Sequence, residues 1–384
     1  MHIGIISKFP PSLSGIAEFS EDFQNALLHV DPSIQCSRIV IDDGKSKINT
    51  DTSVLCTIKK ENEQDYIDAT QIINESSINI LIIQHEFFSY GGPQGIYLSK
   101  LVQKVKKPIV FFPHTVPVDI DAHFVKEQQE FFQSIQLFVK TMVVFLPQAK
   151  QTLLKYGYKQ QDIFICPHAV PLIQHPSSIS MLRKKIQLPT DRWIVMSFGF
   201  FHPDKGTTVT LEAIKQTVQK YPDILFFYAG TTLPMQESQG YFKYIRQLIH
   251  KEHIEQYVYI DMNFIQKQKL FSYIQACDVG IVPYIYRSYT ASGPLSFFIG
   301  AGKPIIATPF AYASSILTPK NSCIVPFENA NAVAQGIEKI KTDEKYRTML
   351  EKNCQSLRSS MTWDVIGKNY CQMLHVINKE YNPS

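Results

Sequence analysis

Short apolar runs alternate with longer amphipathic stretches along this chain, and the alternation constrains the fold more than any other feature. HIGIIS (2–7) and INILIIQ (78–84) are apolar almost throughout and short, whereas IAEFSEDFQNALL (16–28) has helical periodicity. Continuous apolar strands separated by helices are typical of parallel sheets that helices cover on both faces. The sequence therefore predicts an α/β fold with doubly wound parallel sheets.

The alternation runs through the chain twice. Strands are expected at 2–7, 35–41, 78–84, 108–115, 137–146 and 162–167, and again at 193–199, 224–230, 257–261, 279–284 and 304–308. Between the two sets lies VPLIQHPSSIS (170–180), whose prolines and serines are typical of a linker. We predict two Rossmann-like domains over 1–172 and 173–361 that face a cleft, followed by a helical segment over 362–384.

The composition excludes several classes of protein. Apolar residues make up 45% of the chain and charged residues 19%, which suffices for sizeable cores. The net charge of +4 comes without a long basic run, so we expect no nucleic-acid partner. The seven cysteines include no C-x-x-C pair, which favours a reducing cytoplasm over a disulfide framework or a zinc site. We expect neither a signal peptide nor a membrane-spanning helix.

Loops of the first half place polar residues or glycine where predicted strands end. Gly15, after the first strand, would let the backbone approach a sugar or phosphate, although an ordinary turn is equally consistent. His85 and Glu86 follow the strand at 78–84, where ligands of parallel sheets usually lie, and a Gly-Gly turn comes next; a glutamate that caps a turn or forms a local salt bridge is the alternative. His114 ends a further strand and could bind a hydroxyl or carry a proton; a structural histidine is the alternative.

Two loops of the second half could bind an anion. In SFGFFHPDKGTT a strand ends at Gly199 and a helix is expected near Thr207, with His202 and Lys205 between them. A lysine beside a helix start can neutralise a phosphate, although an exposed lysine is usually just solvated. In SYTASGPLSFF, Ser292 is a suitable N-cap for a helix whose N–H groups can hold an anion, and a plain capped helix is the alternative.

Together these segments resemble a known enzyme family. PPSLSGIAEF, QHEFFSYGG, PHTV, FGFFHPDKG and PYIYRSYTASGPLSFFIGAGKPIIATPF occur in the order and spacing of the retaining GT-B glycosyltransferases of family 4, in the subgroup with QHEF…GG and SG-x-L…GKP segments. The resemblance covers almost the whole chain. It implies a GT-B fold whose last helix packs back on the amino-terminal domain.

Loops and resemblance together predict a set of site residues. The resemblance implies that Lys205 pairs with the diphosphate of the donor and that the backbone from Ser292 to Leu295 also binds its phosphates. The stretch from Met262 to Phe264 would lie beside the nucleobase. The predicted residues are Lys205, His114 and Glu86 as catalytic residues; Gly15, Gly199, His202, Asn263, Phe264, Arg287, Thr290, Ser292, Gly293, Pro294 and Leu295 on the donor side; and His85, Gly91 and Gly92 on the acceptor side.

The chain departs from the family's pattern at three positions. The two glutamates of an E-x7-E pattern would fall at Tyr289 and Phe297, and neither residue offers a carboxylate. An arginine found five residues before the lysine is replaced by Phe200. We hypothesise that Arg287 or His202 supplies the missing positive charge.

The resemblance implies transfer of a sugar from a UDP- or GDP-sugar to a hydroxyl of a saccharide or lipid-linked acceptor, with retention of configuration and without a metal or other cofactor. A non-catalytic nucleotide-sugar-binding homologue and, less favoured, a nucleotide-sugar epimerase stay open as alternatives. The helix expected over 94–107 is basic and partly amphipathic, so peripheral membrane contact stays open beside a solvated helix face. The oligomeric state is open.

Overall fold

The computed structural model describes residues 1–45, 51–118, 125–174, 176–232, 236–263 and 265–381. The chain divides into two compact units, of which the first comprises Met1–His168 with Trp363–Ser384 and the second Ala169–Thr362. Within the part of the chain described, no helix has the length and apolar character needed to span a membrane.

The first unit is built on one seven-stranded parallel sheet with the order β3-β2-β1-β4-β5-β6-β7. Its strands are β1 (His2–Ser7), β2 (Gln35–Asp42), β3 (Val54–Lys59), β4 (Ile80–His85), β5 (Ile109–Pro113), β6 (Thr141–Val144) and β7 (Ile163–Ile165). Ile3 of β1 pairs with Cys36 of β2 on one side and with Ile80 of β4 on the other. The sequence did not predict β3, because this edge strand is only half-buried and lacks a continuous apolar run.

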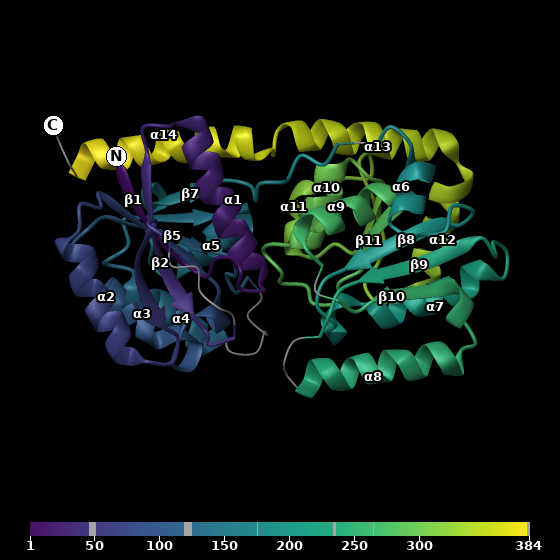
Figure 1. Ribbon diagram of the computed structural model, residues 1–384, viewed down its shortest axis with the longest axis horizontal. Helices are drawn as coiled ribbons and strands as arrows, with labels where there is room; N and C mark the ends of the chain where they lie inside the picture. The colour runs from purple at the N-terminus through teal and green to yellow at the C-terminus, as the bar shows by residue number, and fades with distance from the viewer. Residues whose placement is uncertain (46–50, 119–124, 175, 233–235, 264, 382–384) are drawn as a thin grey trace. The chain divides into compact units, whose positions relative to one another are not determined.

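Helices cover both faces of this sheet. Those of the first unit are α1 (Gly15–Val30), α2 (Glu63–Glu75), α3 (Ile96–Val102), α4 (Val125–Ile135), α5 (Pro147–Lys155) and α14 (Trp363–Tyr381). α2, α3 and α4 lie on one face, and α1 and α14 on the other (Figure 1). The Tyr370 ring of α14 lies 5.2 Å from that of Phe23 in α1, so the last helix packs on the amino-terminal domain.

The helix predicted over 94–107 is wrong in its extent. Gln94 and Gly95 have positive φ angles, and α3 ends at Val102. The Asn74 side chain donates to the Lys104 carbonyl and accepts from the Lys106 N–H. These two hydrogen bonds satisfy the backbone of a loop where the sequence pattern alone favoured a helix.

The second unit contains a six-stranded parallel sheet with the order β10-β9-β8-β11-β12-β13. Its strands are β8 (Trp193–Phe198), β9 (Ile224–Ala229), β10 (Val258–Asp261), β11 (Val279–Val282), β12 (Ile305–Ala307) and β13 (Cys323–Ile324). Its helices are α6 (Ile179–Lys185), α7 (Thr207–Val218), α8 (Gln236–Lys251), α9 (Lys267–Ala276), α10 (Gly293–Ala301), α11 (Ala311–Ile316), α12 (Ala330–Thr342) and α13 (Glu344–Ser359).

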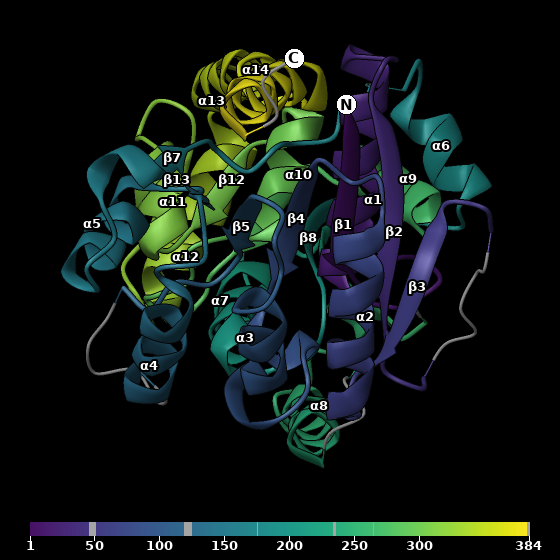
Figure 2. The ribbon, with the colours of Figure 1, turned by 90° about the vertical axis from the view of Figure 1, so that its left-hand side faces the viewer.

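The core of the second unit forms between its sheet and the helices on either face. α7 and α12 pack together on one face, whereas α9 and α10 pack on the other (Figure 1; Figure 2). Side chains such as Val195, Phe226 and Ile281 are buried completely or nearly so between these layers. The prediction of doubly wound parallel sheets is confirmed in both halves of the chain, and it directs attention to the carboxyl ends of the strands.

Candidate functional site

The candidate site of the second unit lies where β8 ends and where α7 and α10 begin. Gly199 follows β8 with a φ of +124°, and a Cβ there would lie 3.9 Å from Pro294 at the start of α10. Gly206 precedes α7 with a φ of +70°, and a Cβ there would lie 1.9 Å from the Pro283 carbonyl oxygen. The loop that carries Lys205 is therefore packed tightly against the segment that follows β11.

Lys205 lies between two tyrosine rings. Its Nζ is 4.2 Å from the ring centroid of Tyr284 and 4.0 Å from that of Tyr289. Within the described residues, no carboxylate oxygen lies within the 4.0 Å that defines an ion pair with this Nζ. Aromatic faces attract an ammonium without neutralising it. The arrangement holds a positive charge in place that an anionic ligand can still use.

A chain of polar contacts surrounds this lysine. The Tyr289 hydroxyl donates to Asp204 Oδ2, and the other oxygen, Oδ1, lies 2.5 Å from His202 Nδ1. His202 Nε2 lies 3.6 Å from Glu237 Oε1. His202 therefore faces two carboxylates and is not a separate cation for a ligand, which weakens the hypothesis that it replaces the missing arginine.

Ser292 is the N-cap of α10, as predicted. Its Oγ accepts from the Leu295 N–H at 3.2 Å, and its carbonyl accepts from the Ser296 N–H at 3.0 Å. Pro294 has no N–H, so Gly293 carries the one N–H of this first turn that lacks an acceptor among the described residues. Ser292 Oγ also lies 3.2 Å from the hydroxyl of Tyr284, the same tyrosine that contacts Lys205.

Aromatic side chains occupy the two positions where the family pattern has glutamates. The Tyr289 ring contacts Lys205, as described above. The Phe297 ring lies 5.8 Å from that of Phe198 and 5.7 Å from that of Phe271. Neither ring can accept hydrogen bonds as a carboxylate does.

The remaining predicted donor residues differ in exposure. Arg287 is exposed, and its guanidinium lies 4.1 Å from the Phe327 ring centroid. It forms no ion pair within the described part of the chain, so it fits the missing positive charge better than His202 does. Thr290 and Leu295 are buried, with 2% and 0% of their surfaces exposed, so their side chains belong to the core beneath the site and are not accessible to a ligand in this conformation.

Asn263 lies in a turn after β10 that Asp261 organises. Asp261 Oδ1 accepts from the Asn263 backbone N–H at 3.1 Å and from its Nδ2 at 2.6 Å, and Oδ2 accepts from the Tyr273 hydroxyl at 2.7 Å. Burial acts to raise the pKa of Asp261, but these hydrogen bonds outweigh it and lower the pKa. Phe264, also predicted beside the nucleobase, lies outside the described residues.

In the first unit, Glu86 and His114 follow neighbouring strands. Glu86 Oε2 accepts from the Thr115 hydroxyl at 2.9 Å, and Oε1 accepts from the Phe87 N–H at 3.3 Å. The His114 N–H donates to the His85 carbonyl at 2.9 Å. The end of β4 and the end of β5 thus bring Glu86 and His114 to the same edge of the sheet.

The His114 ring is held in a defined orientation. Its Nε2 lies 2.9 Å from the Gln84 side-chain amide, within hydrogen-bonding distance. Phe19 contacts the ring edge-on, with centroids 4.6 Å apart. Burial, and then the neighbouring His168 and His85, hold the pKa of His114 well below its ordinary value. His114 is therefore neutral at physiological pH.

His85 is enclosed by aromatic rings. It is 0% exposed, lies between Phe131 and Tyr90 at centroid distances of 4.8 and 5.7 Å, and has no hydrogen-bond partner for either ring nitrogen among the described residues. Burial lowers its pKa to about 3. In this conformation the predicted acceptor-side residue His85 does not reach the surface of its domain.

Replacing His85 with phenylalanine should flatten the pH dependence of stability. The folded state keeps His85 neutral down to a pKa of about 3, whereas the unfolded chain takes up a proton near pH 6.5, so acid favours unfolding. Between pH 7 and pH 5 the wild type should lose about 2 kcal/mol through this residue, and the variant should not. Urea unfolding at both pH values measures this; equal losses would contradict it. His29→Phe, at an exposed position, is the matched control.

The structure explains why glycine is needed at two of the three predicted glycine positions of the first unit, Gly91 and Gly92, but not at Gly15. A Cβ at Gly91 would lie 1.8 Å from the Lys60 carbonyl oxygen, and Gly92 has a φ of +73°. Packing and backbone conformation within the domain therefore account for both. At Gly15, the first residue of α1, a Cβ would meet nothing within 4 Å, so no contact within the domain explains this glycine.

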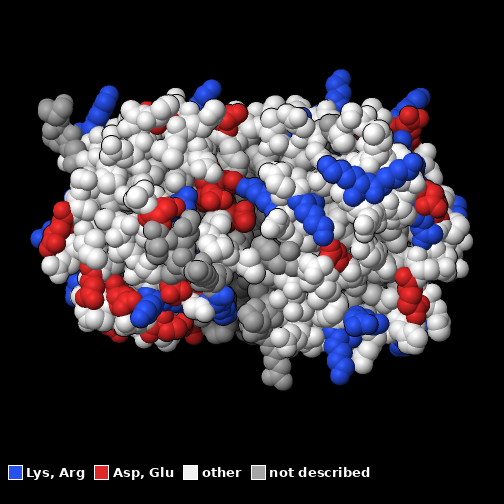
Figure 3. Space-filling view, viewed as in Figure 1, with Lys and Arg blue, Asp and Glu red and all other residues white. Residues whose placement is uncertain are grey.

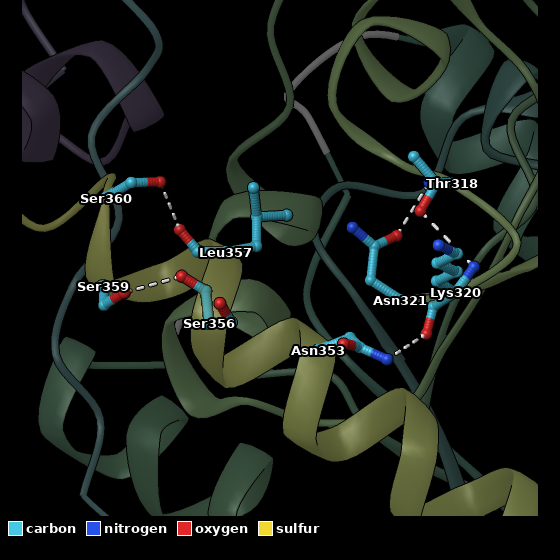
Figure 4. A pocket seen from close by; sticks show the side chains of 8 residues that line it. All are labelled: Thr318, Lys320, Asn321, Asn353, Ser356, Leu357, Ser359 and Ser360. Carbon is cyan, nitrogen blue, oxygen red and sulfur yellow. Dashed lines mark hydrogen bonds between the residues drawn. The ribbon is translucent and has the colours of Figure 1, made fainter.

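An open hollow of about 550 Å³ lies elsewhere in the second unit, between α13 and the loop before β13 (Figure 4). No predicted site residue lines it. The Ser359 and Ser360 hydroxyls donate to backbone carbonyls of the same helix, and Asn353 Nδ2 donates to the Lys320 carbonyl. Its polar groups are thus largely paired with the protein itself.

Charged side chains are distributed unevenly over the surface, and the described residues offer no metal site. On the face seen in Figure 3, Lys and Arg side chains form a short row over the upper part of the second unit, and acidic side chains gather over the lower part of the first unit. No group of three or more His, Cys, Asp or Glu side chains that could hold a metal occurs among the described residues.

Sequence reasoning missed some residues that the fold adds to these sites. Among them, Asp204 could have been recognised from the sequence, because it stands directly before Lys205. Tyr284 and Gln84 end apolar strands and gave no polar pattern by which to single them out. Their contacts with Lys205 and His114 depend on which strands lie side by side.

A family model matches most of the second unit. Residues 178–356 match the model described as Glycosyl transferases group 1, which lies wholly within that unit. The match therefore supports a Glycosyl transferases group 1 domain in this part of the chain. A search of curated protein sequences found no match to the chain.

Solved structures support the fold of the whole chain. The Anabaena protein HepE, crystallised with UDP-glucose, superposes with a TM-score of 0.80 at 16% identity over 98% of this chain and 100% of that chain. Sucrose-phosphate synthase from Thermosynechococcus elongatus gives 0.79 at 16% identity, covering 98% and 99%. An Escherichia coli structure described as trehalose-6-phosphate bound with UDP-2-fluoro glucose gives 0.70 at 11%, covering 99% of both. The chain thus has the predicted GT-B fold.

Proposed function

We propose that this protein is a retaining glycosyltransferase of family 4 that moves a sugar from a nucleotide-diphosphate sugar to a hydroxyl of a saccharide or lipid-linked acceptor. The observation that carries the proposal is Lys205, an ammonium fixed between two tyrosine rings and without a carboxylate partner among the residues that the structure describes. The match of residues 178–356 and the UDP-glucose bound to the Anabaena relative support it. UDP-sugars are therefore our first choice of donor, and GDP-sugars our second.

In the proposed reaction the second domain stabilises the leaving diphosphate. Lys205 would pair with the phosphates, and the Gly293 N–H at the start of α10 would donate to them. The diphosphate itself would help to deprotonate the acceptor as the sugar is attacked from the face that the leaving group vacates. Glu86 and the neutral His114 are the candidates to bind the sugar and acceptor. The proposal requires no metal or other cofactor.

A donor screen by thermal shift tests the proposal. UDP, GDP and ADP, with their common sugars, are added to the wild type and to Lys205→Ala. A ligand at a hundred times its dissociation constant adds about 2.7 kcal/mol to the free energy of unfolding, which shifts the melting temperature visibly. A shift with one nucleotide that Lys205→Ala loses is expected. No shift with any nucleotide would refute the proposal.

Replacing Gly293 with alanine should weaken donor binding without harming the fold. Beyond its two chain neighbours a Cβ at Gly293 would meet nothing within 4 Å, and the residue has no positive φ, so alanine meets no obstacle from distant parts of the domain. If phosphates lie against this helix start, the methyl group blocks them, and we expect about a tenfold weaker UDP affinity by calorimetry, equivalent to about 1.4 kcal/mol. Gly240→Ala, equally unhindered but within α8, is the matched control. Equal affinities for all three proteins would contradict this placement.

A non-catalytic nucleotide-sugar-binding protein is the second candidate, and the aromatic residues Tyr289 and Phe297 in place of the glutamates favour it. Binding of a donor without turnover over a broad acceptor panel would support it. The first proposal includes a cytoplasmic location and peripheral contact with a membrane. The basic helix expected over 94–107 does not support the membrane contact, because α3 already ends at Val102.

A further inference from the structure

We propose that Tyr289 and His202 are positioning residues that hold the Asp204 carboxylate away from Lys205, so that the lysine stays available to the donor diphosphate. This inference rests on the proposed function and deepens it. Asp204 stands directly beside Lys205 in the sequence, and its carboxylate could pair with the ammonium that is proposed to bind phosphate.

An unrestrained Asp204 would compete for the lysine. Neighbouring residues of opposite charge do pair in this protein: Lys60 Nζ lies 3.0 Å from Glu61 Oε1. Asp204 and Lys205 share one short helical turn, Pro203–Lys205, yet they form no such pair. A carboxylate on Lys205 would have to be displaced before a diphosphate could bind, which would lower the affinity.

Both oxygens of Asp204 have other partners. Oδ2 accepts from the Tyr289 hydroxyl, and Oδ1 lies 2.5 Å from His202 Nδ1. The Asp204 carbonyl accepts from the Ile285 N–H at 2.9 Å, which fixes the backbone as well. The carboxylate side chain is 19% exposed, so water competes little for these contacts.

Tyr289 thus has two tasks through two parts of its side chain. Its hydroxyl engages Asp204, and its ring face lies 4.0 Å from Lys205 Nζ. A glutamate at this position could not do both, because it would place a second carboxylate beside the lysine. The departure from the family pattern at position 289 is then a specific arrangement of charge and not simply a loss.

The two tasks can be separated by substitution. Tyr289→Phe keeps the ring over Lys205 and removes the hydroxyl, so Asp204 is released toward the lysine. We expect UDP to bind about tenfold more weakly, which lies within the range of coupling between contacting residues. Tyr289→Phe combined with Asp204→Asn should restore the affinity to near that of the wild type, because a neutral amide cannot pair with the ammonium.

A purely structural role would give another result. If Tyr289→Phe only loosened the loop, Asp204→Asn would add to the loss and not reverse it, and that outcome would overturn the inference. Tyr284→Phe is the matched control: its ring also contacts Lys205, but its hydroxyl lies against Ser292, so Asp204→Asn should not correct its effect. Calorimetric titration of the five variants and the wild type with UDP measures these couplings.

A second measurement separates this inference from the proposed function. In a crystal structure of nucleotide-free Tyr289→Phe, an Asp204 oxygen should lie within about 4 Å of Lys205 Nζ. If the wild type binds no nucleotide, the proposed function fails, and this structure still decides the inference. An Asp204 carboxylate that stays beside His202 and away from Lys205 would overturn it.

Discussion

Replacing Lys205 with alanine is expected to lower the turnover of the donor about a hundredfold or more. Negative charge develops on the diphosphate as it leaves, and a fixed ammonium stabilises that charge more in the transition state than in the ground state. Loss of one such contact costs roughly 2.7–4 kcal/mol in comparable sites. Steady-state kinetics with the donor identified by the thermal-shift screen measure the effect.

The control for this experiment is another lysine of the same helical region. Lys215 lies on α7 and pairs with Glu252 at 2.5 Å, so Lys215→Ala removes the same charge from the chain without touching the candidate site. It should keep the wild-type rate. Lys205→Ala loses no ion pair within the described residues but two cation–π contacts, each worth about 0.5–1 kcal/mol at exposed sites, so it should unfold at a slightly lower urea concentration than the wild type. A wild-type rate in Lys205→Ala would remove the lysine from the mechanism.

Gly206→Ala should destabilise the second domain by about 2–6 kcal/mol. The residue has a φ of +70°, which costs an alanine roughly 1–3 kcal/mol, and the new Cβ would lie 1.9 Å from the Pro283 carbonyl oxygen. Relief of that overlap moves the backbone and adds typically 1–3 kcal/mol. The movement displaces the Lys205 loop from the segment after β11, so donor affinity should fall together with stability.

Urea unfolding of Gly206→Ala is compared with that of Gly240→Ala. At Gly240, within α8, a Cβ meets nothing within 4 Å, and alanine should stabilise the helix by about 0.5–1 kcal/mol. The two substitutions are chemically identical and differ in the backbone and space around them. Equal stabilities would show that the close approach of Gly206 to Pro283 does not hold the loop in place.

The candidate site was predictable to the extent that it depends on local sequence. Ser292 reads as an N-cap before a proline and is one, and Lys205 stands beside the start of α7 as expected. His85 was not predictable in this way: its position after an apolar strand resembles that of a ligand-binding residue, yet aromatic rings from α4 and the loop after β4 enclose it. Burial of a histidine depends on partners distant in sequence.

The sequence by itself determined the fold class, because continuous apolar strands between amphipathic helices can bury their surfaces only in parallel sheets covered on both faces. It also determined which loops carry the charged and capping residues. Only the tertiary structure decided which charges are available. Lys205 is kept from its neighbour Asp204 by Tyr289, a residue 85 positions from Asp204 in the chain. Such contacts arise from the order of strands in the sheet, where β8 lies beside β11, and no local pattern encodes that order.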